Sequence, residues 1–249
     1  MWRCQILGIP IDLIDHKEVL QHINRWRAQG LRQFIVLATA ADIHLSQEDG
    51  LRMALHSSGL NLPDGIAIVM AARILGFMPK GRVAGPDLMW KLCDWGRDYG
   101  YRHFFYGSTP DIVSRLIANL TRRFPGIEIA GYLCPPFRQP TPQEDVEMIR
   151  QINACRSDIV WVGLGGIRQI RWMADHLDKV IAPAMIGVGA AFNFHSGLVK
   201  RAPRWMRQIG MEWSFRMITE PRKIVPRTRH TLMFCIRVTA QALKTSWRS

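Results

Sequence analysis

Residues 184–223 read AMIGVGAAFNFHSGLVKRAPRWMRQIGMEWSFRMITEPRK, and two kinds of structure meet within this stretch. It begins with an apolar run, Ala184 to Gly189, of the kind that forms a strand buried on both faces. A glycine-bearing turn follows, and the segments after that turn are crowded with Arg, Lys and Trp. The stretch therefore predicts the last strand of an α/β core, followed by a basic, Trp-rich appendage.

The residues before this stretch alternate between apolar runs and amphipathic helical patterns. Strand-like runs occupy Gln5–Ile11, Gln33–Ala38, Tyr101–Tyr106, Ile127–Tyr132, Asp158–Gly163 and Ala184–Gly189. Helical patterns occupy Lys17–Gln29, Ala41–Ser57, Gly65–Leu75, Pro86–Tyr99, Asp111–Phe124, Gln143–Cys155 and Ile167–Asp178. Apolar strands separated by helices predict a parallel sheet that is covered on both faces. We expect an α/β core over residues 1–202, a Rossmann-like parallel sheet with helices on both faces, and a C-terminal helical appendage over residues 203–249.

The charge of the chain is concentrated in the appendage. From Lys200 to Ser249 there are twelve Lys or Arg and only two acids, Glu212 and Glu220, so this segment carries +10 of the formal net charge of +13. The first 199 residues are close to neutral, with 21 bases and 18 acids. Because a surface with such an excess of one sign attracts the opposite sign, we expect the appendage to bind something anionic.

Two helices are expected in the appendage, with breaks at Pro221 and Pro226. The apolar side chains of the first recur at every fourth position: Trp205, Ile209, Trp213 and Met217. The second has an apolar stripe with bases on its flank: Leu232, Ile236, Ala240, Leu243 and Trp247, beside Arg229, Arg237, Lys244 and Arg248. Such a helix suits an anionic membrane surface, since apolar groups enter the acyl boundary and bases reach the headgroups. A helix docked on its own core or on a second subunit also needs an apolar stripe, so a homo-oligomer is left open.

Composition narrows the class of protein further. A hydrophobic content of 48% and a charged content of 21% are those of a globular protein. Five scattered cysteines without a CxxC pair argue against a disulfide framework or a zinc site. No apolar run of about 18 residues is present, and Asp12 and Asp15 come too early for a signal peptide. We expect a cytoplasmic protein, either soluble or peripheral to a membrane.

Two motifs offer residues for chemistry, and each also has an ordinary structural explanation. Asp64 lies in a Pro-Asp-Gly sequence, where it would act as a general base at a loop tip. Pro-Asp-Gly is equally a favoured turn sequence. Arg82 precedes a Gly-Pro-Asp sequence at residues 85–87, where it would meet a phosphate beside a helix start. Pro and Asp also suit the first turn of any helix.

The glycine-rich turns are incomplete as nucleotide fingerprints. The turn at residues 163–166 has Arg168 where a dinucleotide motif has its third glycine, and the turn at 187–189 has Phe192 there. The sequence contains no GxxxxGK[ST] loop and no Asp-x-Asp pair at a strand end. We therefore expect no cofactor and no metal site, and an oxidoreductase is disfavoured. Of the histidines, His195 is the candidate for a role near the strand ends.

Together, the motifs resemble those of the WecG/TagA/CpsF family of bacterial glycosyltransferases, glycosyltransferase family 26. The matching segments follow the family's order over nearly the whole chain: Thr39, Pro63-Asp64-Gly65, Arg82 to Leu88, Tyr106-Gly107, Pro125-Gly126, Gly163-Leu164-Gly165 with Gln169 and Trp172, Gly187 to Phe192, Arg201 to Trp205, Gly210 to Trp213, Arg216, and Glu220-Pro221-Arg222. Each segment is weak alone, and the ordered set is specific.

The resemblance implies an inverting enzyme that transfers a sugar, such as N-acetylmannosamine or its uronic acid, from a UDP-sugar to a polyprenyl-diphosphate-linked saccharide. It also implies a peripheral position on the inner face of the cytoplasmic membrane and a role in exopolysaccharide or other cell-surface polysaccharide synthesis. Asp64 corresponds to the family's base. The resemblance places the other site residues at the substrates: Thr39, Arg82, Gly107, Gln169, Gly189 and Asn193 in the core, and Arg201, Arg204, Arg216 and Arg222 as contacts to anionic groups.

The chain departs from the family pattern at positions that bear on the donor sugar. Ala41 stands where the family usually has Asn, Ile170 where it has Glu, and Asn193 where it has Asp. Because Ala41 and Ile170 would remove polar groups that face a sugar, we expect a different donor or a reduced activity. A non-catalytic homologue stays an alternative.

A nucleic-acid-binding protein is a second alternative, since a pI of about 10.2 suits a phosphate backbone. The bases of the appendage are interleaved with Trp, Met and Ile, and no nucleic-acid motif is recognised. We therefore expect no nucleic-acid partner.

Overall fold

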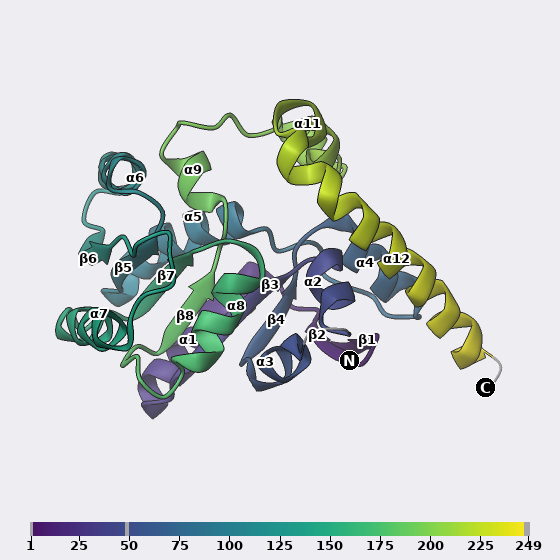
Figure 1. Ribbon diagram of the computed structural model, residues 1–249, viewed down its shortest axis with the longest axis horizontal. Helices are drawn as coiled ribbons and strands as arrows, with labels where there is room; N and C mark the ends of the chain where they lie inside the picture. The colour runs from purple at the N-terminus through teal and green to yellow at the C-terminus, as the bar shows by residue number, and fades with distance from the viewer. Residues whose placement is uncertain (1, 48–49, 247–249) are drawn as a thin grey trace.

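The computed structural model describes residues 2–47 and 50–246. At its centre is a six-stranded parallel sheet with the strand order β4-β3-β8-β7-β5-β6 (Figure 1). The strands are β3 (Gln33–Ala38), β4 (Leu60–Pro63), β5 (Arg102–Gly107), β6 (Glu128–Leu133), β7 (Ile159–Gly163) and β8 (Ala184–Gly187). The Rossmann-like parallel sheet predicted from the apolar runs is confirmed.

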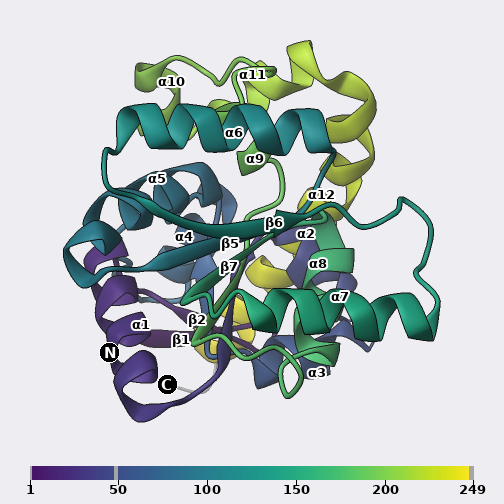
Figure 2. The same ribbon diagram turned by 90° about the vertical axis from the view of Figure 1, so that its left-hand side faces the viewer.

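Helices cover both faces of this sheet (Figures 1 and 2). In β3, the side chain of Val36 joins the core on one face, and that of Ile35 joins the core on the other. The first face is covered by α2 (Ala40–Leu45), α3 (Leu51–Ser57), α4 (Ile66–Ile74), α7 (Pro142–Ala154), α8 (Gly166–Asp175) and α12 (Pro221–Ser246). The second is covered by α1 (His16–Gln29), α5 (Gly85–Trp95), α6 (Pro110–Arg123) and α9 (Ala191–His195), with a 3-10 turn, η1 (Gly96–Tyr99), after α5.

The N-terminal apolar run is a hairpin outside the main sheet, which corrects the prediction of a single strand over Gln5–Ile11. β1 (Arg3–Ile6) and β2 (Ile9–Asp12) pair antiparallel in a sheet of their own. The chain reverses at Leu7 and Gly8, whose φ angles are 51° and 80°. Leucine rarely adopts a positive φ, so the apolar run carries no sign of this turn.

One strand of the main sheet, β4, is not among the predicted strands. Leu60–Pro63 is a fully buried strand that pairs with β3 and is not part of a turn. Asn61 hides the strand pattern in the sequence, and its side-chain amide donates to the carbonyls of Pro10 and Leu55 at 3.0 and 2.7 Å. The single helix predicted over Ala41–Ser57 is α2 followed by α3.

Up to residue 246, the appendage consists of three helices: α10 (Arg204–Gln208), α11 (Glu212–Thr219) and α12. The prediction of one helix from Trp205 to Met217 is wrong, because Gly210 adopts a φ of 79° between α10 and α11. The predicted break at Pro226 is also wrong, since α12 continues through that residue. Pro226 removes one helical hydrogen bond, yet α12 packs along α2 and α4 of the core.

The two sides of α12 differ in character. Phe234 and Val238 are buried against the core. The predicted stripe points away from the core, and its large residues are exposed: Leu232 by 60%, Ile236 by 55% and Leu243 by 59%. Trp247 and Arg248, which would continue the stripe and its basic flank, lie outside the described residues. Within residues 2–47 and 50–246, no helix has the length and apolar character needed to cross a bilayer.

Candidate active site

A cavity of about 570 Å³ opens at the carboxyl ends of the parallel strands. Its walls come from the loops that follow β3, β4, β7 and β8, and from α11 and the start of α12. This edge of an open α/β sheet is where such folds bind ligands. Seven of the eleven residues predicted for the site line this cavity: Thr39, Asp64, Arg82, Gln169, Gly189, Asn193 and Arg216.

Asp64 follows β4 directly and lies at the wall of the cavity. Its backbone N–H donates to the carbonyl of Ala38 at 3.0 Å, which fixes it to the end of β3. Burial raises the pKa of Asp64 to about 7. The guanidinium of Arg82 opposes this rise, and the carboxylates of Glu212 and Asp42 add to it. A carboxyl group with a pKa near neutrality is well matched to general base catalysis at pH 7.

Thr39 caps α2 beside Asp64. Its Oγ1 donates to Oδ2 of Asp42 at 2.7 Å, and the N–H of Asp42 donates back to that Oγ1 at 3.3 Å. This reciprocal cap holds the loop after β3 in place. Asp42 lines the cavity as well, and burial raises its pKa. Asp42 was not predicted as a site residue. An acid three residues after Thr is a helix-capping pattern, so the sequence gives no sign that its carboxyl lines a cavity.

Gln169 joins the two glycine-bearing turns at the cavity. Its Oε1 accepts hydrogen bonds from the N–H groups of Gly165 at 3.2 Å and Gly189 at 3.0 Å. A Cβ at Gly187 would lie 3.1 Å from Nε2 of Gln169, so glycine at this position leaves room for the Gln169 side chain. Gln169 therefore sets the spacing between the turns after β7 and β8, in addition to lining the cavity.

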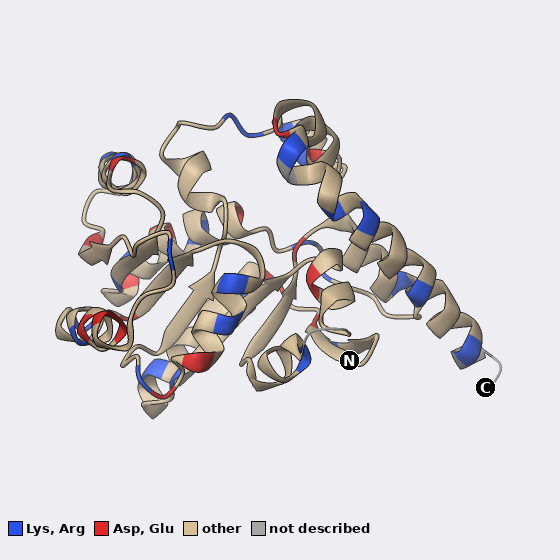
Figure 3. Cartoon of the chain, viewed as in Figure 1, with Lys and Arg blue, Asp and Glu red and all other residues tan. Residues whose placement is uncertain are grey.

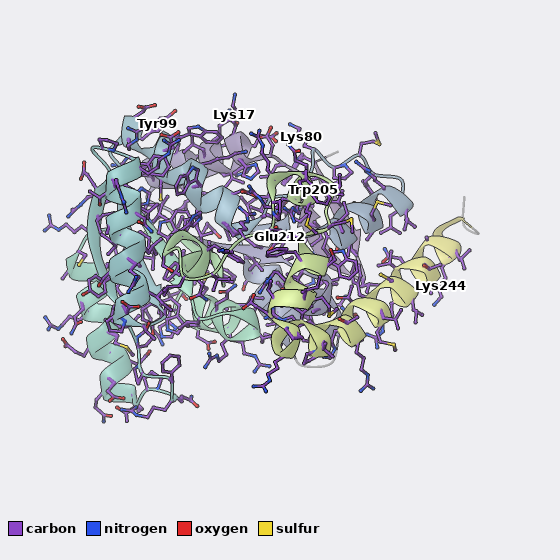
Figure 4. All side chains as sticks on the ribbon, turned by 90° about the horizontal axis from the view of Figure 1, so that it is seen from above. Lys17, Lys80, Tyr99, Trp205, Glu212 and Lys244 are labelled. Carbon is purple, nitrogen blue, oxygen red and sulfur yellow. The ribbon has the colours of Figure 1, made fainter. Side chains whose placement is uncertain are left out.

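An ion-pair network joins the appendage to the core next to Asp64. Glu212 of α11 lies 3.2 Å from Arg82 and 2.9 Å from Arg201. Arg201 also donates to both carboxylate oxygens of Asp87, at 2.6 and 2.8 Å. Figure 4 shows Glu212 toward the middle of the molecule, away from the projecting end of α12. The prediction that Arg201 contacts a substrate anion does not fit this geometry, because two carboxylates already hold its guanidinium.

Replacing Arg201 by Met should lower the free energy of unfolding by roughly 1–3 kcal/mol, because the partly buried carboxylates of Asp87 and Glu212 lose the cation that they share. Asp87 then keeps only Arg207 at 3.4 Å, and Glu212 keeps only Arg82 at 3.2 Å. Arg204 offers a matched control, since it is exposed on α10. Arg204→Met should cost less than about 0.5 kcal/mol. Urea unfolding followed by circular dichroism compares the two variants. An equal loss in both would show that the network does not hold the appendage.

Two arginines of the appendage face the cavity. The Nε of Arg216 lies 3.1 Å from Glu220, and its guanidinium stacks over the ring of Phe194 at 5.7 Å. The Nη2 of Arg227 lies 3.6 Å from the position that a Cβ on Gly166 would take.

Gly166 begins α8, and the residue before it, Gly165, has no side chain with which to cap the N–H groups of the first turn. A guanidinium beside a helix N-terminus provides an anion site, since the N–H groups of the first turn and the cation attract the same charge. Arg227 was not predicted as a site residue. In the sequence it is one of many bases in the appendage, and only its approach to α8 distinguishes it.

The other predicted site residues do not line the cavity: Gly107, Arg201, Arg204 and Arg222. A Cβ at Gly107 would lie 2.7 Å from the backbone of Gly163, so glycine there serves the packing of β5 on β7. Arg204 and Arg222 are exposed on α10 and α12.

The sequence also pointed to Ala41, Ile170 and His195, and the structure assigns each of them to a packing position outside the cavity. Ala41 and Ile170 are buried and do not line the cavity, and the expectation that polar groups at these two positions would face a sugar stays a prediction. Ile170 belongs to the apolar core under α8. The Nε2 of His195 is hydrogen-bonded to the carbonyl of Pro86 at 2.8 Å, and its ring stacks on Trp90 at 5.1 Å. His195 therefore joins α9 to α5.

Among the described residues, no group of three or more His, Cys, Asp or Glu side chains is arranged to hold a metal ion. The expectation that the protein needs neither a metal nor a cofactor stays a prediction.

Among the proteins similar to this chain, two match it over 167 residues, which are 67% of the chain and 63% of each relative's length. Both are N-acetylglucosaminyldiphosphoundecaprenol N-acetyl-beta-D-mannosaminyltransferases, one from Bacillus spizizenii at 34% identity and one from Bacillus subtilis at 32%. The model of the glycosyl transferase WecG/TagA/CpsF family matches residues 4–248. The chain therefore belongs to the WecG/TagA/CpsF family of glycosyl transferases, as its motifs predicted.

Proposed function

We propose that the protein is an inverting glycosyltransferase that moves a sugar from a UDP-sugar to a polyprenyl-diphosphate-linked saccharide. The observation that carries this proposal is the carboxyl of Asp64, whose pKa is raised to about 7 in a cavity that also presents Arg82, Arg216 and Arg227. A base and a cluster of cations in one cavity suit a reaction in which a hydroxyl loses its proton while a diphosphate leaves.

The reaction is a single displacement. The oxygen of the acceptor hydroxyl attacks the anomeric carbon from the face opposite UDP, and Asp64 takes the proton of that hydroxyl. The bond between the anomeric carbon and the UDP oxygen breaks, and its electron pair leaves with UDP. The configuration at the anomeric carbon is thereby inverted, and Asp64 later releases its proton to water.

Departing UDP carries developing negative charge on its diphosphate, which must be stabilised within the cavity. Arg216, Arg227 and the N-terminus of α8 are the groups suited to this task, because they bring two guanidinium groups and a helix dipole to the cavity. Arg82 lies close enough to lower the pKa of Asp64 and so favours the ionised, proton-accepting form.

The names of the two relatives support the choice of substrates. They describe transfer of N-acetylmannosamine to N-acetylglucosaminyldiphosphoundecaprenol. For this chain, the donor would carry N-acetylmannosamine or a related hexose or uronic acid, and the acceptor would be a sugar on a polyprenyl diphosphate. The product would enter the synthesis of exopolysaccharide or another cell-surface polysaccharide.

A lipid-linked acceptor places the enzyme at a membrane, and the appendage is suited to that position. Lys and Arg are spread along α12 (Figure 3), and the stripe of Leu232, Ile236 and Leu243 is exposed. This combination favours binding parallel to an anionic bilayer surface, here the inner face of the cytoplasmic membrane.

UDP release tests the proposal. The protein is incubated with a panel of UDP-sugars and an N-acetylglucosamine diphosphate acceptor on a short prenyl chain, with and without EDTA. We expect UDP release with an N-acetylmannosamine-type donor, only when the acceptor is present, and to the same extent in EDTA. If protein that still binds UDP released none with any donor, the non-catalytic alternative would hold instead.

A further inference from the structure

The wall of the Asp64 cavity contains a carboxylate that the proposed reaction does not use. Glu212, the first residue of α11, lines this cavity together with the arginines that are proposed to stabilise a diphosphate. A carboxylate repels an anionic ligand, so Glu212 is not suited to binding the diphosphate itself. A role for Glu212 must therefore come from the cations that it contacts.

Glu212 bridges two guanidinium groups. Its Oε1 accepts a hydrogen bond from Nε of Arg201 at 2.9 Å, and its Oε2 lies 3.2 Å from Nη2 of Arg82. The side chains of Glu212 and Arg82 are only 13% and 16% exposed, so solvent screens their ion pair little. Arg201 also donates to both carboxylate oxygens of Asp87. Arg201 thus has a second carboxylate, whereas Arg82 depends on Glu212.

The ion pair determines where the guanidinium of Arg82 lies relative to Asp64. Both residues line the cavity, and their loops are joined, because the N–H of Val83 donates to the carbonyl of Pro63 at 2.9 Å. In the described part of the chain, Arg82 forms its ion pair with Glu212 and not with Asp64. An arginine that pairs directly with an aspartate lowers the pKa of that carboxyl by roughly 1–3 units, which would leave a weak base.

The charged groups that act on Asp64 come from four parts of the chain: Asp42 of α2, Arg82 before α5, Arg201 before α10 and Glu212 of α11. The two arginines lower the pKa of Asp64, and the two acids raise it. Arg82 has the larger effect of the two arginines, and Glu212 has the larger effect of the two acids. Because these two are ion-paired, the loss of Glu212 would remove the stronger acid and release the stronger cation at the same time.

We propose that Glu212 is a positioning residue for sugar transfer, which holds the guanidinium of Arg82 off the carboxyl of Asp64. The docking of α11 on the core thereby keeps the base free to take a proton. The inference rests on the proposed function, in which Asp64 is the base, and gives Glu212 a part in it. If Glu212 only fastened the appendage, its loss would act like the loss of Asp87, which belongs to the same network but does not line the cavity.

Replacing Glu212 by Gln tests the proposal. The amide oxygen can still accept from Arg201, but Arg82 loses its partner and is free to turn toward Asp64. The midpoint of the Asp64 titration should fall from about 7 by roughly one to two pH units. The pH profile of kcat/KM for UDP release should shift by the same amount, and its plateau should drop roughly three- to ten-fold, because a weaker base accepts the proton less readily.

Carbon-13 NMR of the whole chain, labelled at the aspartate carboxyl, reads the titration of Asp64 directly. The Asp64 signal is assigned from its loss in Asp64→Asn. Asp87→Asn is the matched control, since it takes a carboxylate from the same Arg201, and it should move the Asp64 midpoint by less than about 0.5 unit. An unchanged midpoint in Glu212→Gln, or an equal shift in both variants, would overturn the proposal.

A charge-balanced variant keeps the test decisive if Glu212→Gln does not fold. Arg82→Gln, Glu212→Gln removes the whole ion pair, so neither charge is left without its partner. Because the two charges act on Asp64 in opposite directions, its midpoint should stay within about 0.5 unit of the wild type. A rise of about one unit or more would show that Arg82 pairs with Asp64 in the wild type, which contradicts the proposal.

The two measurements separate this proposal from the proposed function. NMR reads the carboxyl of Asp64 without substrate, whereas UDP release reads sugar transfer. A lower midpoint in Glu212→Gln, together with no UDP release by the wild type, would support the positioning of Arg82 by Glu212 and contradict the proposed transfer. UDP release by the wild type with no change of midpoint in Glu212→Gln would do the reverse.

Discussion

Replacing Asp64 by Asn is expected to lower the rate of sugar transfer by roughly two to four orders of magnitude, because the acceptor hydroxyl then has no base to take its proton. The amide is nearly the same size as the carboxyl, so the cavity keeps its shape. Turnover is measured as UDP release with saturating donor and acceptor. Asp98→Asn is the control, since Asp98 is exposed in η1, and it should keep wild-type activity. Near wild-type transfer by Asp64→Asn would remove Asp64 from the mechanism.

The same substitution is expected to stabilise the fold. Burial raises the pKa of Asp64 from 3.8 to about 7, so the unfolded chain loses its proton at lower pH than the folded protein does. The wild type therefore loses stability as the pH rises from about 4 to 7, and Asn escapes this loss. Above pH 7, Asp64→Asn should be more stable by roughly 2 kcal/mol, about half of what the full shift would give, since the side chain is partly exposed.

Thermal unfolding at several pH values measures this difference. The gap in unfolding midpoint between the variant and the wild type should widen between pH 4 and 7, stay constant above pH 7, and vanish near pH 4. A gap that does not depend on pH would mean that Asp64 is not held at a raised pKa.

Replacing Arg227 by Gln is the second large effect that we expect. Arg227 approaches the N-terminus of α8 at the cavity, where the diphosphate of departing UDP is proposed to lie. Removing one preorganised charge from a leaving-group site lowers kcat/KM by roughly 10²–10³-fold. The effect should fall mainly on kcat, because the charge on UDP grows as the bond to the sugar breaks.

Arg229 provides a matched control for this substitution. It lies two residues further along α12, is exposed, and does not line the cavity. Arg229→Gln removes the same charge from the same helix and should change kcat/KM by less than about three-fold, since exposed charges are screened. Similar losses in both variants would mean that Arg227 acts only through the general positive charge of the appendage.

The sheet could be predicted because its strands are apolar throughout. Runs such as Gln33–Ala38 are buried on both faces, and glycine ends several strands, so both the parallel sheet and its ligand-binding edge follow from the sequence. Predictions from residue preferences were wrong where contacts with residues far apart in the sequence determine the backbone conformation. Leu7 accepts a positive φ within a hairpin bound by Gln47 and Gln241, and Asn61 lies in a strand because its amide finds partners in other segments.

Site residues that directly follow a strand could be predicted from the sequence, because the strand places them at the ligand-binding edge of the sheet. Site residues whose role depends on contacts with residues distant in the sequence could not be predicted. Asp64 and Thr39 follow β4 and β3, and both lie at the cavity. Arg201 and Arg227 are equivalent bases in the sequence. Only the folded chain pairs Arg201 with Asp87 and Glu212 and brings Arg227 to α8. The sequence gives the charge of each side chain, but it does not show which opposite charges lie close to it in the folded protein.

The dependence of kcat/KM on pH tests the central claim most directly. This quantity reports the pKa of the free enzyme's base, and neither substrate titrates near neutrality, since each diphosphate is esterified at both ends. Between pH 5 and 9, we expect kcat/KM for UDP release to rise with pH, to reach half of its maximum near the Asp64 pKa of about 7, and then to level off. A profile that is flat over this range, or one that is already at its plateau at pH 5, would contradict the account.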